Sequence, residues 1–256
     1  MSVVPLYASL RTKPPAWTIF PLARERTITI LAAEPGAGKT TLLLWATVAA
    51  AQGKAMLASA QTHTPARPLR TLYFALDGPA YDYQYLVNRV CAGQALVPSR
   101  GTPFLFCHKR VDVLVPGELE KVLEAAEKTE HDHEPVDVVV FDAIRAIHTG
   151  DENDSSHMSK VTKRLRDLAE SGPAIILTHH FAKPSKDPKA QVRGLGAMRG
   201  STILDTDLDM QIHLSRIDDA PETFRRLEWA KGRGADVPRV MAFTIRTDAD
   251  VITVTQ

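Results

Sequence analysis

Residues 33–40 read Ala-Glu-Pro-Gly-Ala-Gly-Lys-Thr and lie between two apolar stretches of different character. Thr27–Leu31 is rich in β-branched residues, which predicts a strand buried on both faces, whereas Thr40–Gln52 is Ala-rich without helix breakers, which predicts a helix. The segment matches the phosphate-loop pattern GxxxxGK[ST] except that Ala33 replaces the first glycine. A strand, a Gly-rich turn and a helix in this order predict a helix N-terminus placed at the end of a sheet strand, where an anion binds.

This arrangement indicates a nucleotide phosphate site, because backbone N–H groups at a helix N-terminus surround phosphate oxygens. Lys39 is expected to neutralise the β and γ oxygens, and the Thr40 hydroxyl to hold Mg²⁺. The expected nucleotide-binding residues are consecutive in the sequence: Glu34, Pro35, Gly36, Ala37, Gly38, Lys39, Thr40 and Thr41.

A second carboxylate near the metal is expected at Asp142, which ends the apolar run Val138–Phe141 as in a Walker B element. Taken alone this pattern is weak, since many strands end in an Asp that caps a turn or helix. Because it follows a phosphate loop, we predict that Asp142 supports Mg²⁺ through water.

Strand and helix patterns alternate along most of the chain, which predicts an α/β fold with a mostly parallel sheet flanked by helices. Further strands are expected at 71–76, 104–106, 136–141, 174–178, 209–214, 224–230, 240–246 and 251–255, and helices at 81–95, 118–128 and 157–170. The last two strands can form a hairpin, and together with their neighbours they predict a β-rich C-terminal edge.

Four prolines between residues 1 and 26 disfavour regular structure, so we predict an N-terminal arm, 1–26, followed by one domain, 27–256. The arm could cover its own domain or a neighbouring subunit. The chain has 31 Lys+Arg and 30 Asp+Glu, a net charge of +1, so no global basic field points to nucleic acid, although a local basic patch would suffice. The two cysteines, the absence of an export signal and of a bilayer-length apolar stretch favour a soluble cytoplasmic protein without membrane contact.

With these elements placed, the chain resembles the RecA-like P-loop ATPases, specifically the RepA-type hexameric helicases, the AAA family grouped with them and the DnaB-type helicase core. The likeness runs from about Thr27 to the C-terminus and includes Tyr73–Asp77 and Thr178–His180. The resemblance implies an ATP hydrolase that requires Mg²⁺, assembles into a homo-oligomeric ring of six subunits and moves on single-stranded DNA.

The resemblance also implies roles for individual residues. Asp77 stands where the family usually has the Glu that activates the attacking water, although a simple turn acid before Gly78 remains an alternative. His179 is expected to sense the γ-phosphate. Arg233 would be an arginine finger delivered to the next subunit's nucleotide, with Lys231 as its companion; the alternative is a basic hairpin turn.

The segment from Phe181 to Gly200 is locally basic and contains two glycines before its last residue, which suits a loop that follows a nucleic-acid backbone. In RecA-like rings the equivalent loop lines the central channel, so the resemblance implies DNA contacts from five residues, with a merely solvated loop as the alternative: Lys183, Lys186, Lys189, Arg193 and Arg199.

Two other functions stay open at this point. A recombination, repair or loader ATPase on DNA shares the same core, and the sequence contains nothing against it. A signalling or transport P-loop ATPase without nucleic acid is permitted by the near-neutral charge, but the basic loop speaks against it.

Overall fold

The computed structural model describes residues 15–58, 63–129, 134–181, 202–217, 220–233 and 237–256. Its strands are β1 Trp17–Ile19, β2 Ala23–Arg24, β3 Ile28–Ala33, β4 Thr71–Ala75, β5 Phe104–Cys107, β6 Val138–Asp142, β7 Ala174–His180, β8 Met210–Arg216, β9 Phe224–Gly232, β10 Val240–Thr247 and β11 Ile252–Thr255. Its helices are α2 Lys39–Ala51, α3 Ala80–Gly93, α4 Glu118–Glu127, α5 Ser155–Ser171, α6 Ile203–Asp207 and the 3₁₀ turn η2 Ile144–Ala146.

A nine-stranded sheet forms the centre of the molecule, with the order β11-β10-β9-β8-β3-β7-β6-β4-β5. The strands from β8 to β5 are parallel to one another, whereas β9, β10 and β11 continue the sheet in antiparallel fashion. The predicted mostly parallel sheet with a β-rich C-terminal edge is therefore confirmed, as is the hairpin between the last two strands.

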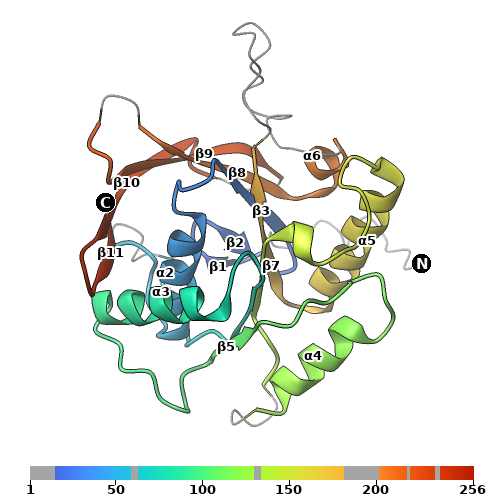
Figure 1. Ribbon diagram of the computed structural model, residues 1–256, viewed down its shortest axis with the longest axis horizontal. Coiled ribbons are helices and arrows are strands. Elements are labelled where there is room, and N and C mark those ends of the chain that lie inside the picture. The colour runs from blue at the N-terminus through green and yellow to red at the C-terminus, as the bar shows by residue number, and fades with distance from the viewer. Residues whose placement is uncertain (1–14, 59–62, 130–133, 182–201, 218–219, 234–236) are drawn as a thin grey trace, which may run out of the picture.

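Helices cover both faces of the sheet, as Figure 1 shows. Because side chains alternate along a strand, β3 sends Ile28, Ile30 and Ala32 to the α5 face and Leu31 and Ala33 to the α2 face. The residues of β3 are all buried, which explains why its sequence is apolar or β-branched throughout. The loop after β3 consequently emerges at the middle of the sheet, between β7 and β8.

The described part of the N-terminal arm covers its own domain. Strands β1 and β2 form a small antiparallel ribbon, and Ile19, Leu22 and Ala23 are buried in the core on the α2 side. The indole Nε1 of Trp229 donates to the carbonyl of Pro21 at 3.3 Å, which ties this ribbon to β9. Of the two expected positions for the arm, residues 15–26 therefore occupy the one on the same chain, in short strands that the prolines did not indicate.

Helix α6 is the main element that the sequence did not predict, since it occupies part of a stretch expected to be a polar loop. Tertiary contacts hold it: the Thr162 hydroxyl donates to the Asp207 carboxylate at 2.7 Å, and Arg166 donates to the Asp207 carbonyl at 2.9 Å. A five-residue segment has little intrinsic helix stability, so long-range contacts with α5 decide its conformation.

Among the helices of the described residues, none has the length and apolar character needed to cross a bilayer.

Candidate nucleotide-binding site

The loop between β3 and α2 has the backbone conformation that its glycines permit. Gly36 and Gly38 have φ values of +74° and +99°, which L-residues with a Cβ rarely adopt. Gly38 is the N-cap of α2 and offers no side chain to the first turn, so the amides at the start of this helix remain available to a ligand. The loop therefore presents N–H donors at the positive end of a helix dipole.

Ala33, which replaces the first glycine of the motif, is accommodated because this position belongs to the strand. It pairs with His180 and Leu214 on its two sides, is fully buried and is not among the residues with positive φ. Its carbonyl accepts a hydrogen bond from Lys39 Nζ at 3.3 Å. A methyl group here packs into the core without disturbing the loop.

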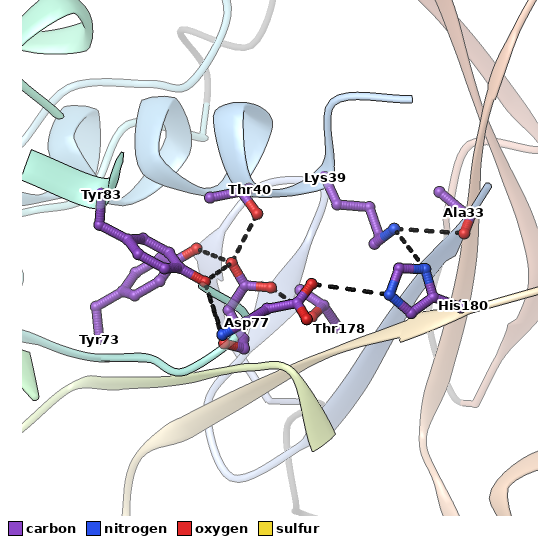
Figure 2. A network of polar contacts seen from close by, with 9 residues as sticks. Ala33, Lys39, Thr40, Tyr73, Asp77, Tyr83, Thr178 and His180 are labelled. Atoms are coloured by element: carbon purple, nitrogen blue, oxygen red, sulfur yellow. Dashed lines mark hydrogen bonds and ion pairs between the residues drawn. The ribbon is translucent and has the colours of Figure 1, made fainter. Parts of the chain in front are cut away.

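Lys39, His180 and Asp77 form a chain of polar contacts at the carboxyl ends of the parallel strands, as Figure 2 shows. Lys39 Nζ lies 3.4 Å from His180 Nδ1, and His180 Nε2 lies 3.7 Å from Asp77 Oδ2. Because an ammonium group only donates, Lys39 is the donor in the first of these contacts. Burial lowers the pKa of Lys39, and the carboxylates of Asp142 and Asp77 oppose this shift.

The carboxylate of Asp142 is fully buried at the end of β6 and accepts hydrogen bonds from four hydroxyl groups. Oδ2 accepts from Thr40 at 2.8 Å, Tyr73 at 2.9 Å and Tyr83 at 3.2 Å, and Oδ1 accepts from Thr178 at 2.6 Å. Figure 2 shows these hydroxyl-bearing side chains converging from α2, β4, α3 and β7. These four donors supply the hydrogen bonds that a buried carboxylate requires.

Tyr83 also connects Asp142 with Asp77. The Tyr83 hydroxyl accepts a hydrogen bond from the Asp77 backbone N–H at 3.2 Å and lies 3.3 Å from the Asp142 carbonyl. Burial, followed by the negative charge of Asp142, raises the pKa of both Tyr73 and Tyr83, so both remain neutral donors. Sequence analysis did not select these tyrosines as site residues, and the only signals for them were the place of Tyr73 in the Tyr73–Asp77 stretch and that of Tyr83 in the first turn of α3.

The oxygen atoms at this point suit Mg²⁺. Thr40 Oγ1 and Asp142 Oδ2 lie 2.8 Å apart beside the phosphate loop, and both are hard oxygen ligands. Within the described residues no group of three or more His, Cys, Asp or Glu side chains forms a metal cluster. Mg²⁺ commonly needs only one or two carboxylates when phosphates and water complete its coordination, so the residues present fit this ion.

The structure separates the two histidines at the end of β7. His180 lies on the same face as Thr178 and points toward Lys39, whereas His179 is buried with 3% exposure on the face that carries Ile175 and Leu177. The reason is the two-residue period of a strand, which sends neighbours to opposite faces. The geometry thus favours His180, and not the expected His179, as the histidine of the site.

Lys231 and Arg233 lie far from the phosphate loop of their own chain. Gly232 pairs with Met210 at the start of β8, while the loop begins at Ala33, which pairs with Leu214. A separation of four strand residues corresponds to about 13 Å. Lys231 Nζ donates to the carbonyls of Asp205 at 2.6 Å and Thr206 at 2.9 Å, and Arg233 also donates to the Thr206 carbonyl.

Two other arginines, which sequence analysis missed, contact the loop instead. Arg225 Nε donates to the Ala37 carbonyl at 2.7 Å, and Arg216 Nη2 donates to the Gly36 carbonyl at 3.1 Å. They come from β9 and β8, whose order in the sheet no local pattern reveals. The five expected DNA-binding residues lie outside the described residues: Lys183, Lys186, Lys189, Arg193 and Arg199.

Comparison with solved structures finds many chains with a similar fold, of which two are described here. The chain matches a structure described as an ATPase domain with a TM-score of 0.62 and 15% identity, over 89% of this chain and 84% of that one. It matches "The Structure Of A DnaB-Like Replicative Helicase And Its Interactions With Primase" with a TM-score of 0.67 and 14% identity, over 98% of this chain and 66% of the other. The fold of the chain is therefore RecA-like, as the sequence predicted.

A comparison with curated proteins finds no match. A family model described as "AAA domain", AAA_25, matches residues 3–186, which include the phosphate loop, Asp77, Asp142 and the strand that ends in His180. Since this match spans well over half of the sequence, the chain belongs to the AAA domain family and carries it on a RecA-like fold.

Proposed function

We propose that this protein is a Mg²⁺-dependent ATPase that forms a six-membered ring and couples hydrolysis to movement on single-stranded DNA, as a RepA-like replicative helicase. The observation that carries the ATPase part is the contact between the Thr40 hydroxyl and the buried Asp142 carboxylate, next to Lys39 and the amides at the start of α2. The family match and the fold shared with an ATPase domain and a DnaB-like replicative helicase support the same proposal.

In this proposal the phosphate loop and Lys39 bind the β- and γ-phosphates, and Thr40 and Asp142 would hold Mg²⁺, Asp142 through water. The ion would supply positive charge that stabilises the phosphate oxygens. Asp77, whose side chain is 46% exposed, orients the water whose oxygen bonds to the γ-phosphorus as the bond to the bridging oxygen breaks. The products are ADP and inorganic phosphate.

His180 takes the sensor role in this proposal, because its ring lies between Lys39 and Asp77 and the backbone of Phe181, the next residue, donates to the Ala33 carbonyl at 3.3 Å. Hydrolysis would change the charge between Lys39 and Asp77, and the electrostatic interaction energy of the His180 ring would change with it. The histidine is also close in sequence to the basic segment 183–199, so a change in its position would be passed along a short length of chain to the proposed DNA-binding loop.

In a ring, the catalytic arginine of each site would come from the neighbouring subunit, because Arg233 does not reach the nucleotide site of its own chain. Since Arg233 and Lys231 sit at the opposite end of β8 and β9 from the loop, they act on a neighbouring subunit's nucleotide if they act as fingers. Burial and the nearby Arg233 charge lower the pKa of Lys231, while Asp209, Asp205 and Asp207 oppose the shift.

Replacing Lys39 with Ala should lower ATP turnover by on the order of 10²-fold or more, because the cation facing the developing phosphate charge is removed. Phosphate release measures the rate, and circular dichroism checks the fold. Lys54→Ala, at an exposed lysine whose ammonium group donates to the Gln52 side chain, is the matched control and should turn over normally. Turnover near the normal rate in Lys39→Ala would contradict the ATP site.

Asp77→Asn should reduce kcat by about 10²-fold or more while the Kd for ATP stays nearly unchanged, since orienting the water matters in the transition state. Single-turnover hydrolysis and nucleotide titration separate the two effects. Asp82→Asn, in the exposed first turn of α3, serves as control. Normal kcat in Asp77→Asn would leave Asp77 as a turn residue.

Single-stranded DNA should stimulate ATP hydrolysis, and the joint replacement of Lys183, Lys186, Lys189 and Arg193 by Ala should weaken DNA binding. The logarithm of the DNA-binding constant decreases with the logarithm of the salt concentration, and the magnitude of this slope should become smaller by about 0.7 for each phosphate that the variant no longer neutralises. Lys160→Ala with Lys163→Ala, both exposed on α5, is the control.

An unaltered salt slope would place the DNA path elsewhere, and DNA-independent ATPase activity would favour a P-loop ATPase without nucleic acid. If DNA stimulates hydrolysis, a duplex-unwinding assay separates a helicase from a recombination or loader ATPase.

A mixture of Arg233→Ala and Lys39→Ala chains tests the ring. Each variant alone should be inactive, and the ATP turnover of Arg233→Ala should be reduced on the order of 10³-fold. Mixed rings should regain partial activity at interfaces where one subunit keeps Lys39 and its neighbour keeps Arg233. Native mass spectrometry confirms that the two chains assemble together. Co-assembled rings without recovered activity would rule out a shared site.

A further inference from the structure

Two arginines of the antiparallel pair β8 and β9 hold the backbone of the phosphate loop. Arg216 and Arg225 are paired directly across β8 and β9, so their side chains leave the same face of the sheet, toward α2. Each donates to one of two consecutive loop carbonyls, Gly36 and Ala37. These strands lie beyond residue 186, where the family match ends.

This pairing is unfavourable for the sheet by itself. Like charges directly opposite on neighbouring strands repel, and Arg225 is buried, with 7% exposure. Its guanidinium contacts carbonyl oxygens of Ala37, Glu222 and Phe224, and among the described residues neither arginine forms an ion pair with a carboxylate. Burial, followed by the charge of Arg216, lowers the pKa of Arg225, while Glu222 opposes the shift.

Holding the Ala37 carbonyl also fixes an amide. The peptide between Ala37 and Gly38 is trans, so its carbonyl and its N–H point in opposite directions. With the carbonyl bound to Arg225, the Gly38 N–H points away from β9, and it makes no hydrogen bond with the described residues. By contrast, the Ala37 N–H is used within the loop, since it donates to the Glu34 carbonyl at 3.2 Å.

The loop glycines lie directly against these strands. A Cβ on Gly36 would lie 3.4 Å from Arg216 Nη2, and one on Gly38 would lie 3.0 Å from Ile245 Cδ1 of β10 and 3.9 Å from Arg225 Nε. The loop is thus pressed onto the antiparallel part of the sheet, which limits how far its peptides can rotate before a nucleotide arrives.

We propose that Arg225, supported by Arg216, is a positioning residue that pre-orients the Gly38 amide for the phosphates and adds positive potential behind the loop. The proposal rests on the nucleotide site proposed above. Because the amide would contact ADP and ATP alike, losing its orientation weakens binding of both nucleotides uniformly and leaves the chemical step unaffected.

The test measures the Kd of a fluorescent ADP and of ATP with Mg²⁺, together with KM, kcat and the melting temperature without nucleotide. Arg225→Met should raise both Kd values about tenfold or more, raise KM and leave kcat within about twofold, since it removes a hydrogen bond from a charged group. Arg225→Lys keeps the charge without the planar fork, and it should also raise Kd, by a smaller factor.

Arg226→Met is the matched control, because Arg226 is the next residue of β9, points to the other face and contacts Glu228 at 3.9 Å. It should bind nucleotide as the wild type does. If Arg225→Met fails to fold, Arg225→Lys and the exposed-site variant Arg216→Met provide the same comparison, and the latter should raise Kd severalfold.

If the folded Arg225 variants bind nucleotide with the same Kd as the wild type, the proposal is overturned. This holds even if their melting temperature is lower, because such a result means that Arg225 only supports the fold. A fall in kcat at unchanged KM would also overturn it. Absence of nucleotide binding in the wild type itself would instead remove the proposed function, so the two failures are distinguishable.

Discussion

The buried carboxylate of Asp142 is the interaction on which the site depends. A charge without solvent is costly unless hydrogen bonds satisfy it, and here four hydroxyls do so from four separate elements. Meeting this requirement brings the start of α2, the strands β4 and β7 and the first turn of α3 together at the end of β6. The same bonds hold its Oδ2 atom beside Thr40.

The second constraint is the position of β3 inside the parallel part of the sheet, between β7 and β8. Its carboxyl end has β7 on one side and β8 on the other, so the loop after it receives His180 from one neighbour and Arg216 from the other. Ligands in open α/β sheets bind at the carboxyl ends of the strands for this reason.

The two ends of strand β9 carry cationic side chains that contact different parts of the molecule. Near its start Arg225 contacts the phosphate loop, and at its finish Lys231 and then Arg233 contact the carbonyls at the end of α6. One extended segment therefore carries the contacts to its own nucleotide site and the two cations proposed to serve a neighbour. Six residues separate Arg225 from Lys231, which corresponds to about 20 Å along the strand.

The sequence by itself predicted the strands of the large sheet, the helices α2 to α5 and the phosphate loop, with Lys39, Thr40 and Asp142 as candidate site residues, because these depend on local periodicity and on contiguous residues. Contacts between distant segments could not be predicted from the sequence, because the pairing of β8 with β3 and of β9 with β8 is fixed by the packing of the whole sheet. No local pattern encodes this pairing. Only the tertiary structure therefore placed Tyr73, Tyr83 and Arg225 at the site and α6 against α5. The choice of His180 over His179 also required the strand's orientation, since a two-residue period separates the faces but does not say which face holds the loop.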